Sequence, residues 1–178
     1  MRPEGCKVKV LITCERGRER EVLEELAGLG MFEPSGFRDV ILGEVDNLEE
    51  FLQAVEMKPF LPIMRVVPLE ETFYFSPENF LEVVKERASK HVDRIQKGQT
   101  FAVRMERRGM KGVLSSREVE REVGGYIWQL LHERWGERPK VNLTDPDWLI
   151  AIETVGNFGG ISFIPRDFRQ RYRLIRVK

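Results

Sequence analysis

The side chains with the clearest chemical potential are cationic, and they gather in one stretch of the second half of the chain. Arg104 lies in a strand-like segment, and Arg107, Arg108 and Lys111 lie in the glycine-punctuated loop that follows it. Guanidinium groups can bind phosphate oxygens in a bidentate manner or stack on bases. None of these groups requires a particular base edge. The stretch therefore predicts contacts with the backbone and shape of a nucleic acid rather than with its sequence.

The same loop leads into a predicted helix over residues 115–135. Ser115-x-x-Glu118 is a capping-box pattern, which is typical of a helix start. Free N–H groups and the helix dipole favour an anion at this point.

Two further arginines, Arg117 and Arg121, are four residues apart and so share one face of this helix. In one interpretation they add to the phosphate-binding surface. In the alternative, they pair with Glu118 and Glu122 in an ordinary salt-bridged helix face, which is the commoner situation. The loop arginines have too few neighbouring acids to be explained in that way, and they favour the first interpretation.

A second basic cluster is found in residues 166–178, which hold six positive residues and one negative residue. Phe168 and Tyr172 interleave with the arginines, a composition that suits a segment that follows RNA with occasional stacking. Two alternatives remain: a solvated tail, or a linker to a partner. The RNA-binding prediction in this cluster covers Arg169, Arg171 and Arg173.

Catalytic patterns are not evident, and we predict no catalytic residues, no cofactor and no metal. Neither G-x-G-x-x-G after a strand nor GxxxxGK[ST] is found, and the glycine cluster 156–160 fits a hairpin turn better than a nucleotide cradle. The two histidines, His91 and His132, have no nucleophile or ligand partners at the expected spacing. Two cysteines outside any CxxC pair predict packing residues in a reducing compartment. An active site shaped only by the fold stays as an alternative.

The charge of the chain is zero overall but divided between its halves. Residues 1–70 contain nine Lys/Arg and fourteen Asp/Glu, and the remainder contains twenty and fifteen. Such an asymmetry indicates an anionic partner better than the net charge does. No apolar run approaches the roughly 18 residues that cross a bilayer, and the first residues are polar. We therefore expect a cytoplasmic protein with no membrane association.

Hydrophobic periodicity predicts an α+β fold. The first 75 residues have a βαβαβ rhythm, which suggests a small unit over 1–70, and a second unit over 71–165 precedes the basic C-terminal tail 166–178. The expected strands are 7–14, 37–45, 63–75 with an interruption at Pro68, 100–105, 148–155 and 160–164. The expected helices are 18–29, 47–57, one that opens at Ser76-Pro77, and 115–135.

The pattern in the second half resembles the THUMP domain over about residues 70–165. The resemblance rests on the segments Phe101–Arg104, Arg107-Arg108, Ser115–Glu118, Glu122–Gly124, Val141–Asp147 and Gly159–Ile161. It implies an RNA-binding module that engages the acceptor region and 3′ end of tRNA and that follows a ferredoxin-like unit. By match to the motif, it also implies RNA contacts for the basic and serine residues of the loop and helix start: Arg104, Arg107, Arg108, Lys111, Ser115, Ser116, Arg117 and Arg121. Asp145-Pro146-Asp147 is interpreted as a turn, because its acids would repel phosphate.

The sequence contains no segment that resembles a modifying-enzyme domain. The resemblance therefore implies a stand-alone adaptor that binds tRNA for a separate tRNA cytidine acetyltransferase, the enzyme that makes N4-acetylcytidine. The alternative is an RNA-associated structural or ribosome-assembly factor without a role in modification. Both predict the basic surface, and only the first predicts the loss of one modified nucleoside when the gene is deleted.

Overall fold

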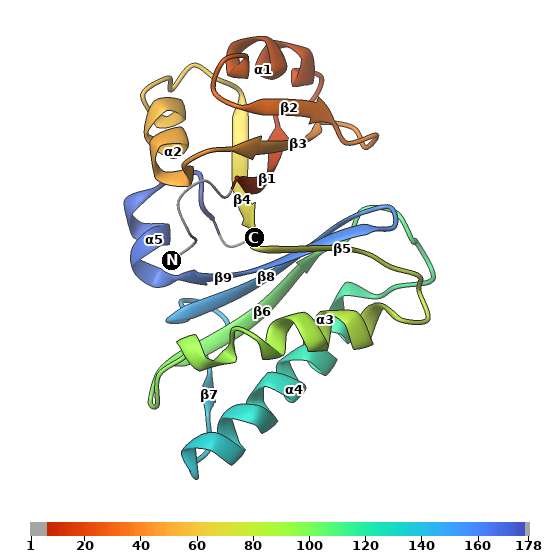
Figure 1. Ribbon diagram of the computed structural model, residues 1–178, viewed down its shortest axis with the longest axis vertical. Coiled ribbons are helices and arrows are strands. Elements are labelled where there is room, and N and C mark those ends of the chain that lie inside the picture. Colours follow the sequence, from red (N-terminus) through yellow and green to blue (C-terminus); the bar gives the residue numbers. More distant parts are fainter. Residues whose placement is uncertain (1–6, 177–178) are drawn as a thin grey trace. The chain divides into compact units, whose positions relative to one another are not determined.

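A computed structural model describes residues 7–176, which divide into two compact units (Figure 1). Residues 7–70 together with 167–176 form the first unit, and residues 71–166 form the second unit. Each unit has its own β-sheet, so the α+β class expected from the sequence is confirmed.

The first unit is ferredoxin-like, as predicted. Its elements are β1 (Val8–Cys14), α1 (Glu19–Leu26), β2 (Met31–Pro34), β3 (Val40–Val45), α2 (Leu48–Glu56) and β4 (Ile63–Leu69). The sheet order is β2-β3-β1-β4, and every neighbouring pair is antiparallel. Each helix buries one apolar row: Val22 and Leu26 from α1, and Phe51, Leu52 and Val55 from α2.

Two sequence expectations for the first unit were wrong. Pro68 does not interrupt β4, because this strand lies at the edge of the sheet, where a missing N–H leaves no ladder bond unmade. The strand expected over 37–45 begins only at Val40. The residues before it form a turn in which Asp39 has a φ of 60°, and the short β2 was not anticipated.

The basic C-terminal segment is folded into the first unit and is not a free tail. After α5 (Arg166–Arg171), three apolar side chains, Tyr172, Leu174 and Ile175, are buried. The backbone of Leu174 joins the segment to β4 and to the end of α2. Leu174 O accepts a hydrogen bond from Val66 N at 2.9 Å, and Leu174 N donates one to Glu56 Oε1 at 2.9 Å. The apolar residues that alternate with the arginines explain this packing.

The second unit is a five-stranded sheet covered on one face by two helices. Its elements are β5 (Glu71–Tyr74), α3 (Phe80–Ser89), a 3₁₀ turn (Val92–Arg94), β6 (Thr100–Glu106), α4 (Ser116–Trp135), β7 (Lys140–Val141), β8 (Trp148–Val155) and β9 (Phe158–Pro165). The sheet order is β5-β9-β8-β6-β7, with β6 parallel to both of its neighbours. In Figure 1, α3 and α4 run side by side across one face.

Strand β6 divides its side chains between the two faces of this sheet. Phe101, Val103 and Met105 join the core beneath the helices, whereas Arg104 and Glu106 alternate with them and point to the opposite face. Strand β6 ends at Glu106, and the basic loop begins there. The basic loop therefore leads from the end of β6 to the first turn of α4.

Candidate nucleic-acid interface

The basic loop between β6 and α4 is held in place by its apolar residues. Met110 and Leu114 pack against the core of the second unit, and Met110 O accepts hydrogen bonds from the N–H groups of Val113 and Leu114, both at 3.0 Å. Met110 itself has a φ of 55°, a left-handed conformation that is uncommon for a side chain of its size. With two side chains turned inward, the loop holds Lys111 exposed.

Helix α4 begins as the sequence predicts. Ser115 precedes the first helical residue with an extended backbone, and its Oγ accepts a hydrogen bond from Glu118 N at 3.3 Å. The cap fixes where the helix starts, and thereby where Ser116 and Arg117 project. Ser115 is exposed, and Ser116 is half-buried.

Arg108 has a different environment from the one that phosphate binding requires. Its side chain is 12% exposed, and its guanidinium forms an ion pair of 2.7 Å with the buried Glu153 and a second of 3.4 Å with Glu106. Its backbone N donates to Thr154 Oγ1 at 3.1 Å, and its O accepts from Gly156 N at 2.8 Å. The sequence could not show that a carboxylate of β8 pairs with this arginine. We therefore assign Arg108 to positioning the loop rather than to RNA contact.

Arg104 and Arg107 each use one of their N–H groups on a nearby backbone carbonyl. Arg104 Nη2 donates to Leu143 O at 2.8 Å, and Arg107 Nη1 donates to Gly109 O. A guanidinium has five N–H groups in a fixed plane, so each side chain keeps donors for a ligand while its position is fixed. Both remain predicted phosphate contacts.

Three cations of the same region are exposed and have no partner in the part of the chain that the structure describes. Within residues 7–176, the side chains of Lys111, Arg117 and Arg121 form no ion pair or hydrogen bond. Glu122 pairs with Lys85 of α3 at 3.8 Å instead of with an arginine of its own helix. The salt-bridged helix face that the sequence left open is therefore not formed, and these cations are available to a ligand.

The arginines of the C-terminal segment are more occupied. Arg171 pairs with Glu49 at 3.0 Å, and its guanidinium lies over the rings of Phe168 and Tyr172, with 5.6 and 5.4 Å to the ring centroids. Tyr172 is buried and cannot stack on a base. Arg169 also has an intramolecular interaction, and Arg173 is exposed. The predicted RNA contacts of Arg169, Arg171 and Arg173 stay predictions.

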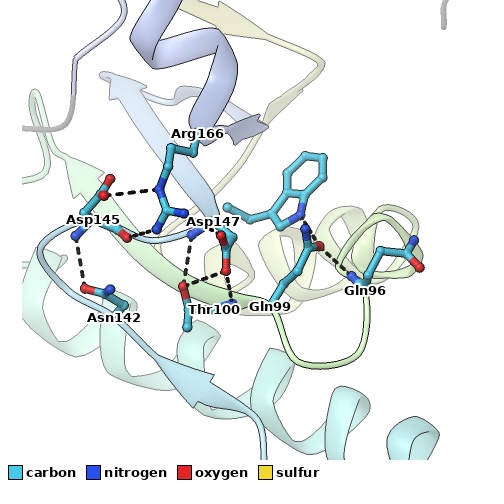
Figure 2. Close-up of polar contacts among 8 residues, drawn as sticks. Gln96, Gln99, Thr100, Asn142, Asp145, Asp147 and Arg166 are labelled. Atoms are coloured by element: carbon cyan, nitrogen blue, oxygen red, sulfur yellow. Dashed lines mark hydrogen bonds and ion pairs between the residues drawn. The ribbon is translucent and has the colours of Figure 1, made fainter.

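The Asp145-Pro146-Asp147 turn closes a polar network that joins the starts of β6 and β8 to the end of β9 (Figure 2). Asp147 Oδ2 accepts hydrogen bonds from Thr100 N at 2.7 Å and Thr100 Oγ1 at 3.1 Å, and Asp147 Oδ1 pairs with Arg166 Nη1 at 2.7 Å. The bond from the Thr100 backbone, more than any other contact, lowers the pKa of Asp147. The turn thereby holds the ends of these strands together, which agrees with its interpretation as a structural turn.

An aromatic pair beside the basic loop was not singled out from the sequence. Tyr74 is 75% exposed, and its ring lies 5.3 Å from that of Phe158, its register partner across β5 and β9. The bond from Gly156 N to Arg108 O ties this end of the sheet to the loop. An exposed aromatic side chain beside cations can stack on a base. Only strand pairing brings the two together, so spacing in the sequence carries no signal of it.

Groups that suggest other chemistry are few in the part of the chain that the structure describes. No cluster of three or more His, Cys, Asp or Glu residues there could hold a metal ion, and no helix is long and apolar enough to cross a membrane. Cys14 is buried, which raises the pKa of its thiol to about 12. Its nucleophilic thiolate is therefore scarce at neutral pH.

Comparison with known proteins identifies the second unit. Residues 77–163 match the model of the THUMP domain, so the chain contains a THUMP domain. The crystal structure of TrmN from Thermus thermophilus has a similar fold, with a TM-score of 0.65 and 21% identity over 88% of this chain and 45% of that one.

Two curated proteins are similar in sequence. Uncharacterized protein MJ0421 of Methanocaldococcus jannaschii is 24% identical over 172 residues, which are 93% of this chain and 43% of that protein. The probable tRNA sulfurtransferase of Methanosarcina mazei is 42% identical over 59 residues, 33% of this chain and 14% of that protein. This chain therefore spans less than half the length of each relative. Part of this chain is thus similar to part of a probable tRNA sulfurtransferase.

Proposed function

We propose that this chain is a non-catalytic tRNA-binding adaptor of the cytoplasm, which presents tRNA to a separate modifying enzyme. The observation that carries the proposal is the surface formed by Lys111, Arg117 and Arg121 on a THUMP domain: three exposed cations that have no partner among residues 7–176. A protein surface that holds cations free in this way favours a polyanion, and phosphates supply most of the affinity of protein–nucleic acid complexes. Arg107, in the same loop as Lys111, is a further predicted contact, whereas Arg104 points to the face of the sheet away from α4.

The region of tRNA that we propose is the acceptor end with its single-stranded 3′ terminus. An exposed aromatic ring such as that of Tyr74 suits a single strand, whose bases are free to stack, better than a duplex, whose bases are stacked already. Binding measured with intact tRNA and with tRNA trimmed of its 3′-terminal nucleotides tests this point. We expect trimming to weaken binding at least tenfold, and equal affinities would contradict 3′-end recognition.

The enzyme that we propose as the partner is a tRNA cytidine acetyltransferase. This step rests on the resemblance to stand-alone THUMP proteins. The test is the formation of N4-acetylcytidine by an acetyltransferase with acetyl-CoA and tRNA, with and without this chain. We expect strong stimulation by the chain and no turnover by the chain alone. Turnover without the acetyltransferase would show that the chain is itself an enzyme.

The sequence match to a tRNA sulfurtransferase favours a second candidate, in which the partner transfers sulfur to tRNA. Mass spectrometry of tRNA nucleosides from a strain that lacks the gene distinguishes the two. Loss of N4-acetylcytidine alone supports the first candidate, and loss of a thiolated nucleoside alone supports the second. Unchanged nucleosides in a strain with defective ribosomes would favour a structural RNA-associated role.

A further inference from the structure

Two adjacent glycines, Gly124 and Gly125, lie in the middle of helix α4 (Ser116–Trp135). Glycine is the least favourable residue for a helix interior apart from proline, because it loses the most backbone freedom on folding. A glycine pair at the centre of a 20-residue helix is therefore a cost to the fold unless a close neighbour requires the absence of a Cβ.

Residues 7–176 do not supply that neighbour. A Cβ on Gly125 would meet no atom within 4 Å, and a Cβ on Gly124 would meet only Val103 Cγ2 at 3.9 Å, an ordinary contact. Gly43 in the first unit shows the opposite case, because a Cβ there would lie 2.3 Å from the ring of Phe32. Alanine would fit at both positions of α4, so packing among the described residues does not require glycine at either one.

The position of Gly125 relative to the free arginines indicates what approaches it. Arg117, Arg121 and Gly125 follow each other at intervals of four residues, so they form one row along the helix surface. Gln129 continues the row, and its Nε2 donates to Glu133 at 3.0 Å. The row therefore passes from two unpartnered cations to bare backbone within one turn of about 5.4 Å.

Three acids flank this row: Glu118 and Glu122 on one side, and on the other Glu120, whose Oε1 accepts a hydrogen bond from Met105 N at 2.9 Å. Glu118 is exposed beside Arg121, and Glu122 is occupied by Lys85 of α3. On the other flank, Arg138 lies over the ring of Trp128, and Lys140 is exposed on β7. An anionic ligand on the row is therefore attracted toward the β7 side, where Gly124 also lies.

We infer that the ribose–phosphate backbone of the bound RNA passes along this row and packs directly on the α4 backbone at Gly124–Gly125. This inference rests on the proposed function and adds to it a steric contact in which the missing side chains make room for the RNA chain. Arg117 and Arg121 bind the phosphates that precede the contact, and the glycine pair admits the sugar beyond them.

The test is a pair of variants, Gly125→Ala and Gly125→Leu, each examined for thermal unfolding and for tRNA binding. Because alanine is the better helix former and its Cβ has open space, we expect Gly125→Ala to raise the unfolding midpoint by about 2–4 °C. We expect the same variant to weaken tRNA binding about threefold to tenfold, and Gly125→Leu to weaken it more than tenfold. If Gly125→Ala is more stable than wild type and binds tRNA less tightly, damage to the fold cannot explain the loss of affinity.

The matched control is Glu133→Leu, two turns further along the same exposed row. Loss of an acid can only favour an anionic ligand, so weaker binding by this control would show that a leucine anywhere on α4 disturbs the complex, and would overturn the inference. Undiminished binding by both Gly125 variants, or a fall in midpoint together with affinity, would also overturn it. Failure of the wild-type chain to bind tRNA at all would instead remove the proposed function and the inference with it.

Discussion

The loop–helix segment 107–121 and the C-terminal segment 166–176 each hold five basic residues, and the structure places these cations in different surroundings. In the first, Lys111, Arg117 and Arg121 are exposed and have no partner among the described residues. In the second, Arg171 pairs with Glu49, and apolar side chains between the arginines are buried in the first unit. The number of cations in a segment does not show whether the segment could bind a ligand. The contacts that each cation makes in the folded protein do distinguish a candidate ligand surface from a structural element.

The strongest test of this comparison removes an apolar anchor of the C-terminal segment. Tyr172 is 5% exposed, so Tyr172→Ala should lower the free energy of unfolding by about 4 kcal/mol, the loss typical of a buried aromatic side chain. Chemical denaturation measures the change. A loss below about 1 kcal/mol would mean that the segment is a dispensable tail after all.

A second test distinguishes Arg108 from the free cations of its own loop. Arg108→Ala leaves the carboxylate of Glu153 buried without its partner, so we expect a loss of about 3 kcal/mol from the free energy of unfolding. Lys111→Ala, three residues away, serves as the control and should change it by less than about 0.5 kcal/mol. Equal effects of the two substitutions would refute the division between positioning and binding residues.

The hydrogen bonds and the ion pair of Asp147 predict that the stability of the protein depends on pH. The folded-state pKa of Asp147 lies below its usual value, so the carboxylate contributes stability above the unfolded-state pKa of about 4, and this contribution is lost as the pH falls through the folded-state pKa. Asp147→Asn should therefore lower stability by about 1–2 kcal/mol at pH 7. Unfolding midpoints of both proteins from pH 7 to pH 3 should converge at the acidic end. A difference that stays constant would rule out the charge of Asp147 as its cause.

The smallest expected effect is that of the exposed ion pair between Arg171 and Glu49. Both side chains are about half exposed, so Arg171→Ala should change the free energy of unfolding by less than about 0.5 kcal/mol. Denaturation at low and high salt checks the value. A large loss would show that the arginines, and not the apolar residues between them, hold the segment in place.

Much of the fold could be predicted from local patterns. The capping box at Ser115 and the apolar row of α4 gave the start and the end of that helix, and the sheet order of the first unit agrees with the ferredoxin-like prediction. The short strands β2 and β7 were missed. They have four and two residues, too few for a period to show.

The candidate site was only partly predictable, for a physical reason. Spacing along one helix brings Arg117 and Arg121 together, and it does so in any fold. The partners of Arg108, by contrast, come from strand pairing: Glu106 and Glu153 are register partners of β6 and β8. The pair of Tyr74 and Phe158 arises in the same way. Contacts across a sheet are set by tertiary register, which one sequence does not reveal.

The central claim, that the unpartnered cations of the loop–helix segment bind RNA, is tested most directly by the salt dependence of tRNA binding. The first protein to compare with wild type is the triple variant Lys111→Ala/Arg117→Ala/Arg121→Ala. The second is the matched triple variant Arg169→Ala/Arg171→Ala/Arg173→Ala, which removes the same charge from the C-terminal segment. The tRNA affinity of each variant is calculated from the concentration of folded protein, so that a difference in stability does not affect the comparison.

Each phosphate contact adds about 0.7–0.9 to the slope of log affinity against log salt concentration. The account predicts a slope smaller by about 2 to 3 in the first variant and by less than about 1 in the second. The reverse order, or equal losses in both variants, would contradict it and would place the RNA on the C-terminal arginines or on net charge alone.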